Sequence, residues 1–461
     1  MSTDPELGSE ASTPALVRGL GAWDAALLTI GTIIGTGIFL TPGGVAAAVG
    51  SAASPFVWIV AGMLTLAGAL AYAELGAMYP RAGGLYHFLK EAWGPATGFL
   101  YGWTCLLCIM SGGIAAIAVG FGEYLGVFLP WFASSHAVLR LGEWTVNGAQ
   151  VAALIAIGLL TAVNHVGVRE GARVQGAFTL AKLAAIAMLI GWGVARPSLT
   201  GVAIALPASP PGGWSAFAGA FGFAMIATLW TYDGWYALTF SAAEVKQPAR
   251  NLPRGLLIGV GVVIVAYGAL SYVYLRALPQ EMLAHSTRVA EDAALALAGP
   301  RAARFMALAV VVSSFGCLAA TILYSSRVYQ PMAADGVFFR RVARIHPKYR
   351  TPVPALWLQS LVAAALTLSG SYNQLFTFVT FGGLLFHVMT GLALFRLRAT
   401  RPDQTRPYRA WGYPLLPALF VLGMAWLTVN TLLASPRESL LGLGLIATGL
   451  PAYAWWRRTE R

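Results

Sequence analysis

The sequence predicts an all-α membrane protein with twelve transmembrane helices. Of its 461 residues, 57% are hydrophobic and only 10% are charged, whereas a soluble domain carries about 25% charged residues. Apolar stretches of about 20 residues, the length that crosses the hydrocarbon core of a bilayer, recur from Trp23 to Trp456. The sequence lacks the short segments of alternating polarity that a transmembrane β-barrel requires.

These stretches define the twelve spans. We expect the spans at residues 22–47, 54–79, 96–129, 149–167, 173–195, 214–243, 254–277, 301–334, 353–369, 372–398, 412–434 and 438–456. The third, sixth and eighth are longer than a bilayer requires, so each should be tilted, broken or extended beyond it. Residues 1–15 are polar and predict a disordered cytoplasmic tail without a cleavable signal peptide, followed by a transporter domain at 16–461.

The distribution of Lys and Arg predicts the orientation of the chain. If the N-terminus is cytoplasmic, 21 of the 30 Lys and Arg residues lie in inner segments and seven in outer segments. Cytoplasmic loops of membrane proteins are enriched in these residues, so we expect both termini in the cytoplasm. The net charge of +12 needs no nucleic-acid partner, because the basic residues are spread over membrane-edge loops.

All three cysteines, Cys105, Cys108 and Cys317, lie within predicted spans. The C-x-x-C at 105–108 fits small packing residues better than a metal or redox site, because no further Cys or His completes a ligand set. We therefore expect no metal and no cofactor. The predicted outer loops contain no cysteine, so we also expect no disulfide-linked partner subunit.

Two spans carry helix-breaking residues near their middle. The first contains TIIGTGIFLTPGG (32–44) and the sixth contains WTYDGW (230–235). Gly and Pro are unfavourable in helix interiors, and unpaired backbone at membrane depth is tolerated only where it lines a cavity. A glycine packing seam would explain one such stretch. Here two such stretches occupy matched positions in two halves of five spans each. This pattern indicates an inverted-repeat transporter whose site lies where the broken helices meet.

The backbone groups that such breaks leave unpaired suit an α-amino acid. Free N–H groups around Thr36, Gly37 and Ile38 can bind a carboxylate. Free carbonyl groups at the ends of the first half-helices can bind an ammonium group, and these belong to Ile33, Ile34, Trp230 and Thr231.

The two interrupted stretches also resemble a known family. IIGTGIFLTP (33–42) together with WTYDGW (230–235) and EVKQPARNLPRG (244–255) resembles the amino acid–polyamine–organocation superfamily, and within it the L-type amino acid transporters and their bacterial relatives. Other matching stretches are AYAELGAMYPRAGGLYHFLKEAWGP (71–95), SSFGCLAATILYSSRVYQPMAADG (313–336), HPKYRTPVPAL (346–356) and RPYRAWGYPLLPALF (406–420).

This resemblance implies a five-plus-five inverted repeat, with residues 22–195 as the first repeat and 214–398 as the second. Two additional helices then lie in residues 412–456. It also implies sodium-independent transport of neutral amino acids, often by exchange.

Within the first break, the resemblance implies roles for single residues. Gly35, Thr36 and Gly37 match the small-residue motif that binds the substrate carboxylate. Ile33 and Ile34 match positions whose carbonyls meet the amino group.

Within the second break, Trp230 stands where the family has an aromatic gate over the substrate. The unwound segment continues with Thr231, Tyr232, Asp233, Trp235 and Tyr236. Several relatives have Asn where this chain has Tyr236, and a phenol there either narrows the pocket or adds a hydrogen bond. The side-chain specificity therefore stays open.

The predicted fifth span carries one charge, Lys182. A lone Lys at this depth usually faces a cavity and a partner. Snorkelling is less favourable, because Lys182 lies about nine residues, or roughly 14 Å, into the span. The resemblance implies that Lys182 replaces the sodium ion of related transporters. Its implied partners are the carbonyls of Gly31 and Ile34, and Ser313 or Ser314. A fixed tether and a proton-exchanging group both remain possible roles for this lysine.

Other polar or small residues have weaker assignments. Asp233 either faces the site or caps the second half of the sixth span. We expect Glu74 and Glu244 to be gate or loop contacts, and Arg327 to bond carbonyls near the inner end of the eighth span. His387 is expected to be a packing residue. Gly112 and Gly113 either leave space beside the site or allow close helix packing.

Together these patterns predict a secondary amino-acid transporter of a bacterial inner membrane that works by alternating access. The bacterial assignment rests on the Ala- and Gly-rich composition. A proton-coupled carrier of cationic amino acids or polyamines, with Asp233 as the acidic partner, is the alternative. A channel or a membrane-embedded enzyme is disfavoured, because the sequence shows neither a filter-like repeat nor a nucleophile–base set, paired carboxylates or a metal cluster.

Overall fold

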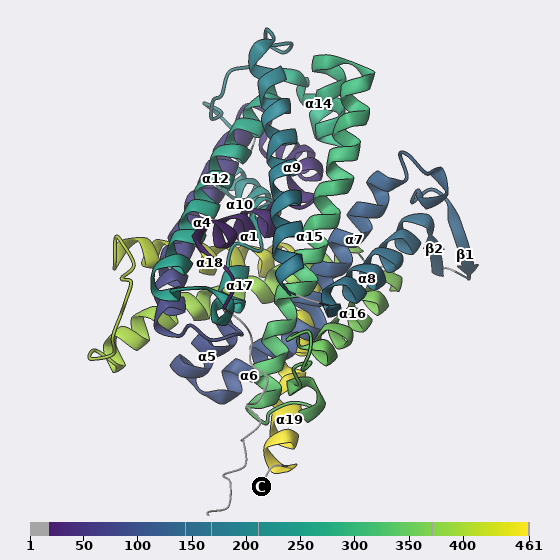
Figure 1. Cartoon of the computed structure of the whole chain (residues 1–461). Coiled ribbons are helices and arrows are strands. Elements are labelled where there is room, and N and C mark those ends of the chain that lie inside the picture. Colours follow the sequence, from purple (N-terminus) through teal and green to yellow (C-terminus); the bar gives the residue numbers. More distant parts are fainter. Residues whose placement is uncertain (1–17, 143, 167, 211, 370–371, 460–461) are drawn as a thin grey trace, which may run out of the picture.

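The computed structural model describes residues 18–142, 144–166, 168–210, 212–369 and 372–459, and it is a bundle of long helices (Figure 1). Within these residues, ten helical segments are long and apolar enough to cross a membrane. The predicted tail at 1–15 lies outside the described residues. The fold is therefore that of a helical membrane protein.

The ten apolar segments correspond to ten of the predicted spans. They are α1 (Ala22–Ile33) with α2 (Gly37–Leu40), α4 (Ser54–Met78), α6 (Pro95–Thr104) continuing to α7 (Met110–Leu125), α8 (Gly148–Val166), α9 (Val168–Ala195), α10 (Gly213–Tyr232), α12 (Pro248–Ala277), α15 (Pro300–Ala334), α17 (Tyr372–Thr400) and α18 (Leu415–Ala434). Two further helices, α16 (Val353–Leu368) and α19 (Pro436–Thr459), lie at the predicted ninth and twelfth spans but are not among the ten.

Short elements connect the long helices. They are α3 (Pro42–Val49), α5 (Leu85–Trp93), α11 (Ala237–Phe240), α13 (Gln280–His285), α14 (Val289–Ala298), the π-helix η1 (Cys105–Ile109) and the 3-10 turns η2 (Pro130–Phe132), η3 (Ala242–Glu244) and η4 (Arg340–Ala343).

One β-hairpin interrupts the helical pattern, and the sequence analysis did not predict it. Its strands β1 (Ala137–Leu141) and β2 (Trp144–Asn147) pair antiparallel between α7 and α8. The indole N–H of Trp144 donates to the carbonyl of Leu368 at 2.7 Å, which attaches the hairpin to the end of α16.

The helix axis is interrupted at both positions that the glycines indicated. The first span stops at Ile33 and becomes helical again at Gly37. The sixth span stops at Tyr232, and the short helix α11 begins at Ala237. Gly234, within this second interruption, has a φ of +90°, a conformation that side-chain-bearing residues rarely adopt.

Two groups of long helices pack closely together (Figure 1). In one group, α12 packs along both α1 and α4, and α10 packs on α4. In the other group, α7, α8, α15 and α16 pack against one another. Helix α1 also contacts α9 and α15, so the break in α1 faces the second group. This arrangement places the unpaired backbone in the interior of the molecule.

Candidate functional site

The break in α1 leaves a run of backbone donors without partners. The N–H of Ile34 still bonds the carbonyl of Ile30 at 2.9 Å, but the N–H of Gly35 turns to the carbonyl of Ile33 at 2.9 Å. Among the described residues, none accepts a hydrogen bond from the N–H groups of Thr36, Gly37 and Ile38. Three consecutive donors are thus available to an anion, since backbone N–H groups at such a position favour negative charge.

Lys182 caps the carbonyl end of the first half-helix. Its Nζ lies 3.0 Å from the carbonyl oxygen of Gly31 and 2.6 Å from that of Ile34, and the side chain is 1% exposed. The last carbonyls of a helix have no partner within it, and a cation there also opposes the negative end of the helix dipole. The lysine therefore satisfies groups that the break has orphaned.

Of the two serines named from the sequence, only Ser313 reaches this point. The hydroxyl of Ser313 lies 3.5 Å from the carbonyl of Ile34. The hydroxyl of Ser314 instead bonds the carbonyls of Val310 and Val311 within its own helix, at 2.7 and 3.0 Å. Helix α15 thus touches the end of the first half-helix through Ser313 and also through Cys317, whose Sγ donates to the carbonyl of Thr32 at 3.4 Å.

The two interrupted segments contact each other directly. The hydroxyl of Thr32 donates to the carbonyl of Gly234 at 3.1 Å, and the hydroxyls of Thr41 and Thr231 lie 2.9 Å apart. A Cβ on Gly37 would lie only 2.8 Å from Oγ1 of Thr231 and 3.1 Å from its Cα. Gly37 therefore has to be glycine for the two segments to approach this closely.

Three buried tyrosines serve the remaining freed carbonyls, and the sequence analysis did not single them out. The hydroxyl of Tyr267 lies 3.2 Å from the carbonyl of Ile33 and 3.3 Å from that of Thr231. Tyr274 reaches the carbonyl of Ile38, and Tyr124 reaches that of Phe39, each at 3.3 Å. Tyr267 thus bridges both breaks. Each carbonyl has two lone pairs, so that of Thr231 keeps acceptor capacity, whereas that of Ile33 already accepts from both Gly35 and Tyr267.

A cavity lies where the two breaks meet. We call it the central cavity. Seven of the residues predicted for the site line it: Ile33, Gly35, Thr36, Gly37, Trp230, Thr231 and Asp233. Gly113 also lines it, and a Cβ there would meet nothing within 4 Å, so this glycine leaves space beside the site.

A second cavity, the side cavity, adjoins the first through Ile109, Trp230 and Asp233, which line both. Trp235 and Tyr236 line the side cavity rather than the central one. His387 completes its wall; its Nδ1 lies 2.7 Å from the hydroxyl of Tyr72, and its ring stacks on Trp235. The histidine therefore has both the packing role expected of it and a place at this cavity.

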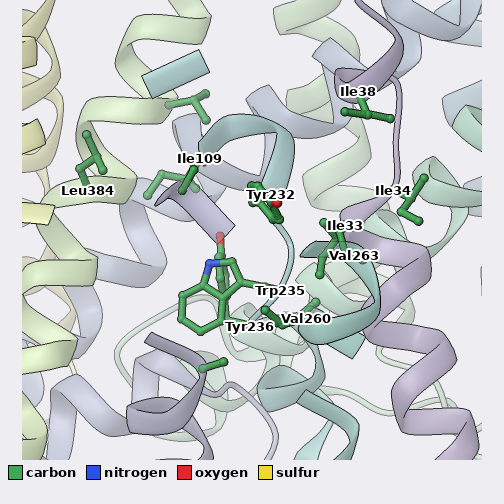
Figure 2. Close-up of a cluster of buried hydrophobic side chains, with 14 of the residues drawn as sticks. Ile33, Ile34, Ile38, Ile109, Tyr232, Trp235, Tyr236, Val260, Val263 and Leu384 are labelled. Carbon is green, nitrogen blue, oxygen red and sulfur yellow. The ribbon is translucent and has the colours of Figure 1, made fainter. Parts of the chain in front are cut away.

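The remaining predicted residues lie in the surrounding packing. Figure 2 shows Ile33, Ile34 and Ile38 on one side of a buried cluster, Ile109 and Leu384 on the other, and Tyr232, Trp235 and Tyr236 between them. The hydroxyl of Tyr232 donates to the carbonyl of Trp58 at 3.1 Å, so this side chain ties the second break to α4.

Several residues of the central cavity could not be chosen from the sequence. They are Thr32, Ile109, Met110, Ile117, Gly234, Cys317, Thr321 and Tyr324. Most are apolar or small residues on helices that are apolar along their length, so no sequence signal separated the cavity face from the lipid face. Cys317 could have been found by its place four residues after Ser313 on the same helix face.

Two buried ion pairs fix one end of the molecule. Arg327, expected to bond carbonyls, does contact the carbonyl of Leu323, but it also donates through Nε and a terminal nitrogen to Oε1 of Glu244, at 2.9 and 2.8 Å. Glu74 accepts two hydrogen bonds from Arg398, at 2.9 and 2.6 Å. Both acids are thus held in contacts at span ends, as the sequence analysis expected.

A cavity walled by two interrupted membrane helices is the arrangement of a secondary transporter. Residues 20–450 match the family model described as "Amino acid permease". The chain therefore belongs to the amino acid permease family, a family of transporters within the amino acid–polyamine–organocation superfamily.

Characterised relatives match nearly the whole chain. The "Serine/threonine exchanger SteT" of Bacillus subtilis (strain 168) is 31% identical over 445 residues, which cover 95% of this chain and 96% of the relative. The human "Large neutral amino acids transporter small subunit 2" is 33% identical over 466 residues, covering 99% and 84%. The mouse "b(0,+)-type amino acid transporter 1" is 30% identical over 455 residues, covering 96% and 89%.

Proposed function

We propose that this chain exchanges neutral L-amino acids across the membrane without sodium. Membership of the amino acid permease family supports amino-acid transport. The names of two relatives, a serine/threonine exchanger and a large neutral amino acid transporter, support neutral substrates and exchange.

The observation that carries the proposal is the run of free N–H groups at Thr36, Gly37 and Ile38 beside the central cavity. The substrate carboxylate binds these donors. The ammonium group binds carbonyls at the ends of the first half-helices, from Ile33, Ile34, Trp230 and Thr231, and it shares the first two with the donors that already contact them. Trp230 lies between the central and side cavities, and there it covers the substrate. The side chain of the substrate points past Trp230 and Asp233 toward the side cavity.

Sodium independence rests on Lys182. Its ammonium group supplies a positive charge where the carbonyls of Gly31 and Ile34 converge. A sodium ion would need several oxygen ligands free at the same position, and the lysine already occupies two. We favour a fixed tether over a proton-exchanging group, because this lysine completes the end of a helix.

The proposed layout follows the sequence. Twelve helices comprise a five-plus-five inverted repeat, 22–195 and 214–398, and two further helices at 412–456. The bias of Lys and Arg places both termini in the cytoplasm, and the composition favours a bacterial inner membrane. We expect no cofactor, metal or disulfide-linked partner subunit.

Exchange in proteoliposomes tests the function. Vesicles loaded with unlabelled L-serine or L-leucine should take up the same labelled amino acid faster than empty vesicles, and the uptake should saturate. A rate that is linear in concentration and independent of the internal amino acid would contradict a carrier. Competition by all common amino acids then defines the substrate range.

A second candidate is a carrier that accepts cationic amino acids. Asp233 lines both the central and the side cavity, so its carboxylate could pair with a cationic side chain. Competition of L-leucine exchange by L-arginine and L-lysine distinguishes the two. An Asp233→Asn protein should lose inhibition by the cationic amino acids and keep that by neutral ones if Asp233 has this role.

A further inference from the structure

A third cavity, the inner cavity, lies below the central one on the side whose loops carry most of the Lys and Arg residues. It is bounded by α1, α9, η3 and α15. Tyr324 lines both this cavity and the central one. Its ring lies 5.7 Å from that of Phe240, and both side chains are buried. The Tyr324 side chain is therefore part of the wall of both cavities.

The inner cavity contains a polar group without a partner. Gln175 of α9 lines it and is 5% exposed, and its Nε2 has no hydrogen-bond partner among the described residues. A buried amide donor left unpaired is unfavourable. The amide lies against Gly31, because a Cβ built there would be 2.5 Å from Nε2. Gln175 is thus held beside the first half-helix with a free donor at the cavity wall.

The inner cavity also contains acidic side chains, which can attract a positively charged group. Glu244 and Asp24 line the same cavity, together with the hydroxyl-bearing Ser241. Glu244 is 3% exposed, and Arg327 binds its Oε1 from the α15 side. Asp24 is exposed and accepts the N–H of Gly21 at 2.8 Å. The arginine balances one of the two acids, so the lining of the cavity combines an excess of negative charge with an amide donor.

We propose that the inner cavity is a second binding site for a zwitterionic α-amino acid, separate from the site between the broken helices. The amide of Gln175 donates to the carboxylate of the amino acid, and the carboxylates of Asp24 and Glu244 attract its ammonium group. This inference rests on the proposed exchange function. The site holds the amino acid on the cytoplasmic side before the Tyr324 wall opens, so it raises the local concentration of the internal exchange partner.

The proposed inner site predicts that a change at Gln175 affects transport from one face of the membrane only. Uptake of labelled L-serine and L-leucine is measured in right-side-out vesicles, which present the outer face, and in inverted vesicles, which present the inner face. Gln175→Met removes the donor but keeps an unbranched side chain of similar length. The half-saturating concentration should rise about tenfold in inverted vesicles, the effect of losing one hydrogen bond to a charged group, and stay within about twofold in right-side-out vesicles. Gln175→Glu, which opposes the substrate carboxylate, should raise it further on the same face.

The control removes an amide elsewhere. Gln280 on α13 is exposed and contacts Ser51, and Gln280→Met should change neither half-saturating concentration. The ratio of the half-saturating concentrations in inverted and right-side-out vesicles does not depend on the amount of folded protein. Poor expression therefore cannot imitate the effect. An equal rise on both faces, or no rise on either, would overturn the inner site. Failure of the wild-type protein to exchange either amino acid would instead contradict the proposed function.

Discussion

Replacing Lys182 with methionine removes the ammonium group while keeping a long, unbranched side chain. Two buried carbonyls, those of Gly31 and Ile34, would then lose donors at 3.0 and 2.6 Å. Each unsatisfied group costs about 1–3 kcal/mol, or about 2–6 kcal/mol for both, although the Ser313 hydroxyl, 3.5 Å from the carbonyl of Ile34, would still satisfy part of the second. The variant no longer buries a charge, which offsets part of this loss, so we expect the lower half of the range. That is a large share of the usual stability of about 5–15 kcal/mol.

We therefore expect Lys182→Met to unfold at a lower temperature in detergent and to lose most exchange of L-serine and L-leucine. Lys90→Met is the matched control, because Lys90 pairs with Asp335 at 2.6 Å and both side chains are about 30% exposed. Such exposed pairs contribute only about 0.2–1 kcal/mol. Equal stability and equal transport in the two variants would refute the capping role of Lys182.

Three further predictions concern coupling and the central cavity. Wild-type exchange should proceed at the same rate in sodium chloride and in choline chloride, and a strict sodium requirement in reconstituted vesicles would refute the argument from Lys182. Gly37→Val should insert into the membrane but lose substrate binding, because its Cβ would lie 3.1 Å from the Cα of Thr231. Overpacking of this kind costs about 1–3 kcal/mol. Normal uptake by this variant would exclude the proposed carboxylate site. Trp230→Ala should weaken apparent affinity and broaden the substrate range by joining the two cavities that Trp230 lines, and unchanged selectivity in a competition assay would show that Trp230 is only a packing residue.

The sequence by itself determined the membrane fold and the position of the broken helices. Composition and the length of the apolar stretches are enough for the first, because a bilayer admits few backbone structures. The second follows from glycines at Gly35, Gly37 and Gly234, where a helix is least stable. A lone charge in an apolar span pointed to Lys182, since only a polar partner makes such a residue tolerable at that depth.

The tertiary structure decided which side chains bond the backbone carbonyls that the breaks leave free. Tyr267 meets carbonyls of both interrupted segments, although it lies 234 residues from Ile33 and on a span that is apolar along much of its length. The sequence also grouped Trp230 and Tyr236 in one site, whereas the fold turns Trp230 toward both cavities and Tyr236 toward the side cavity alone. A membrane helix is apolar on its lipid face and its packed face alike, so hydrophobic periodicity does not identify the inward side chains. Only the packing of α7, α12 and α15 around the breaks selects them.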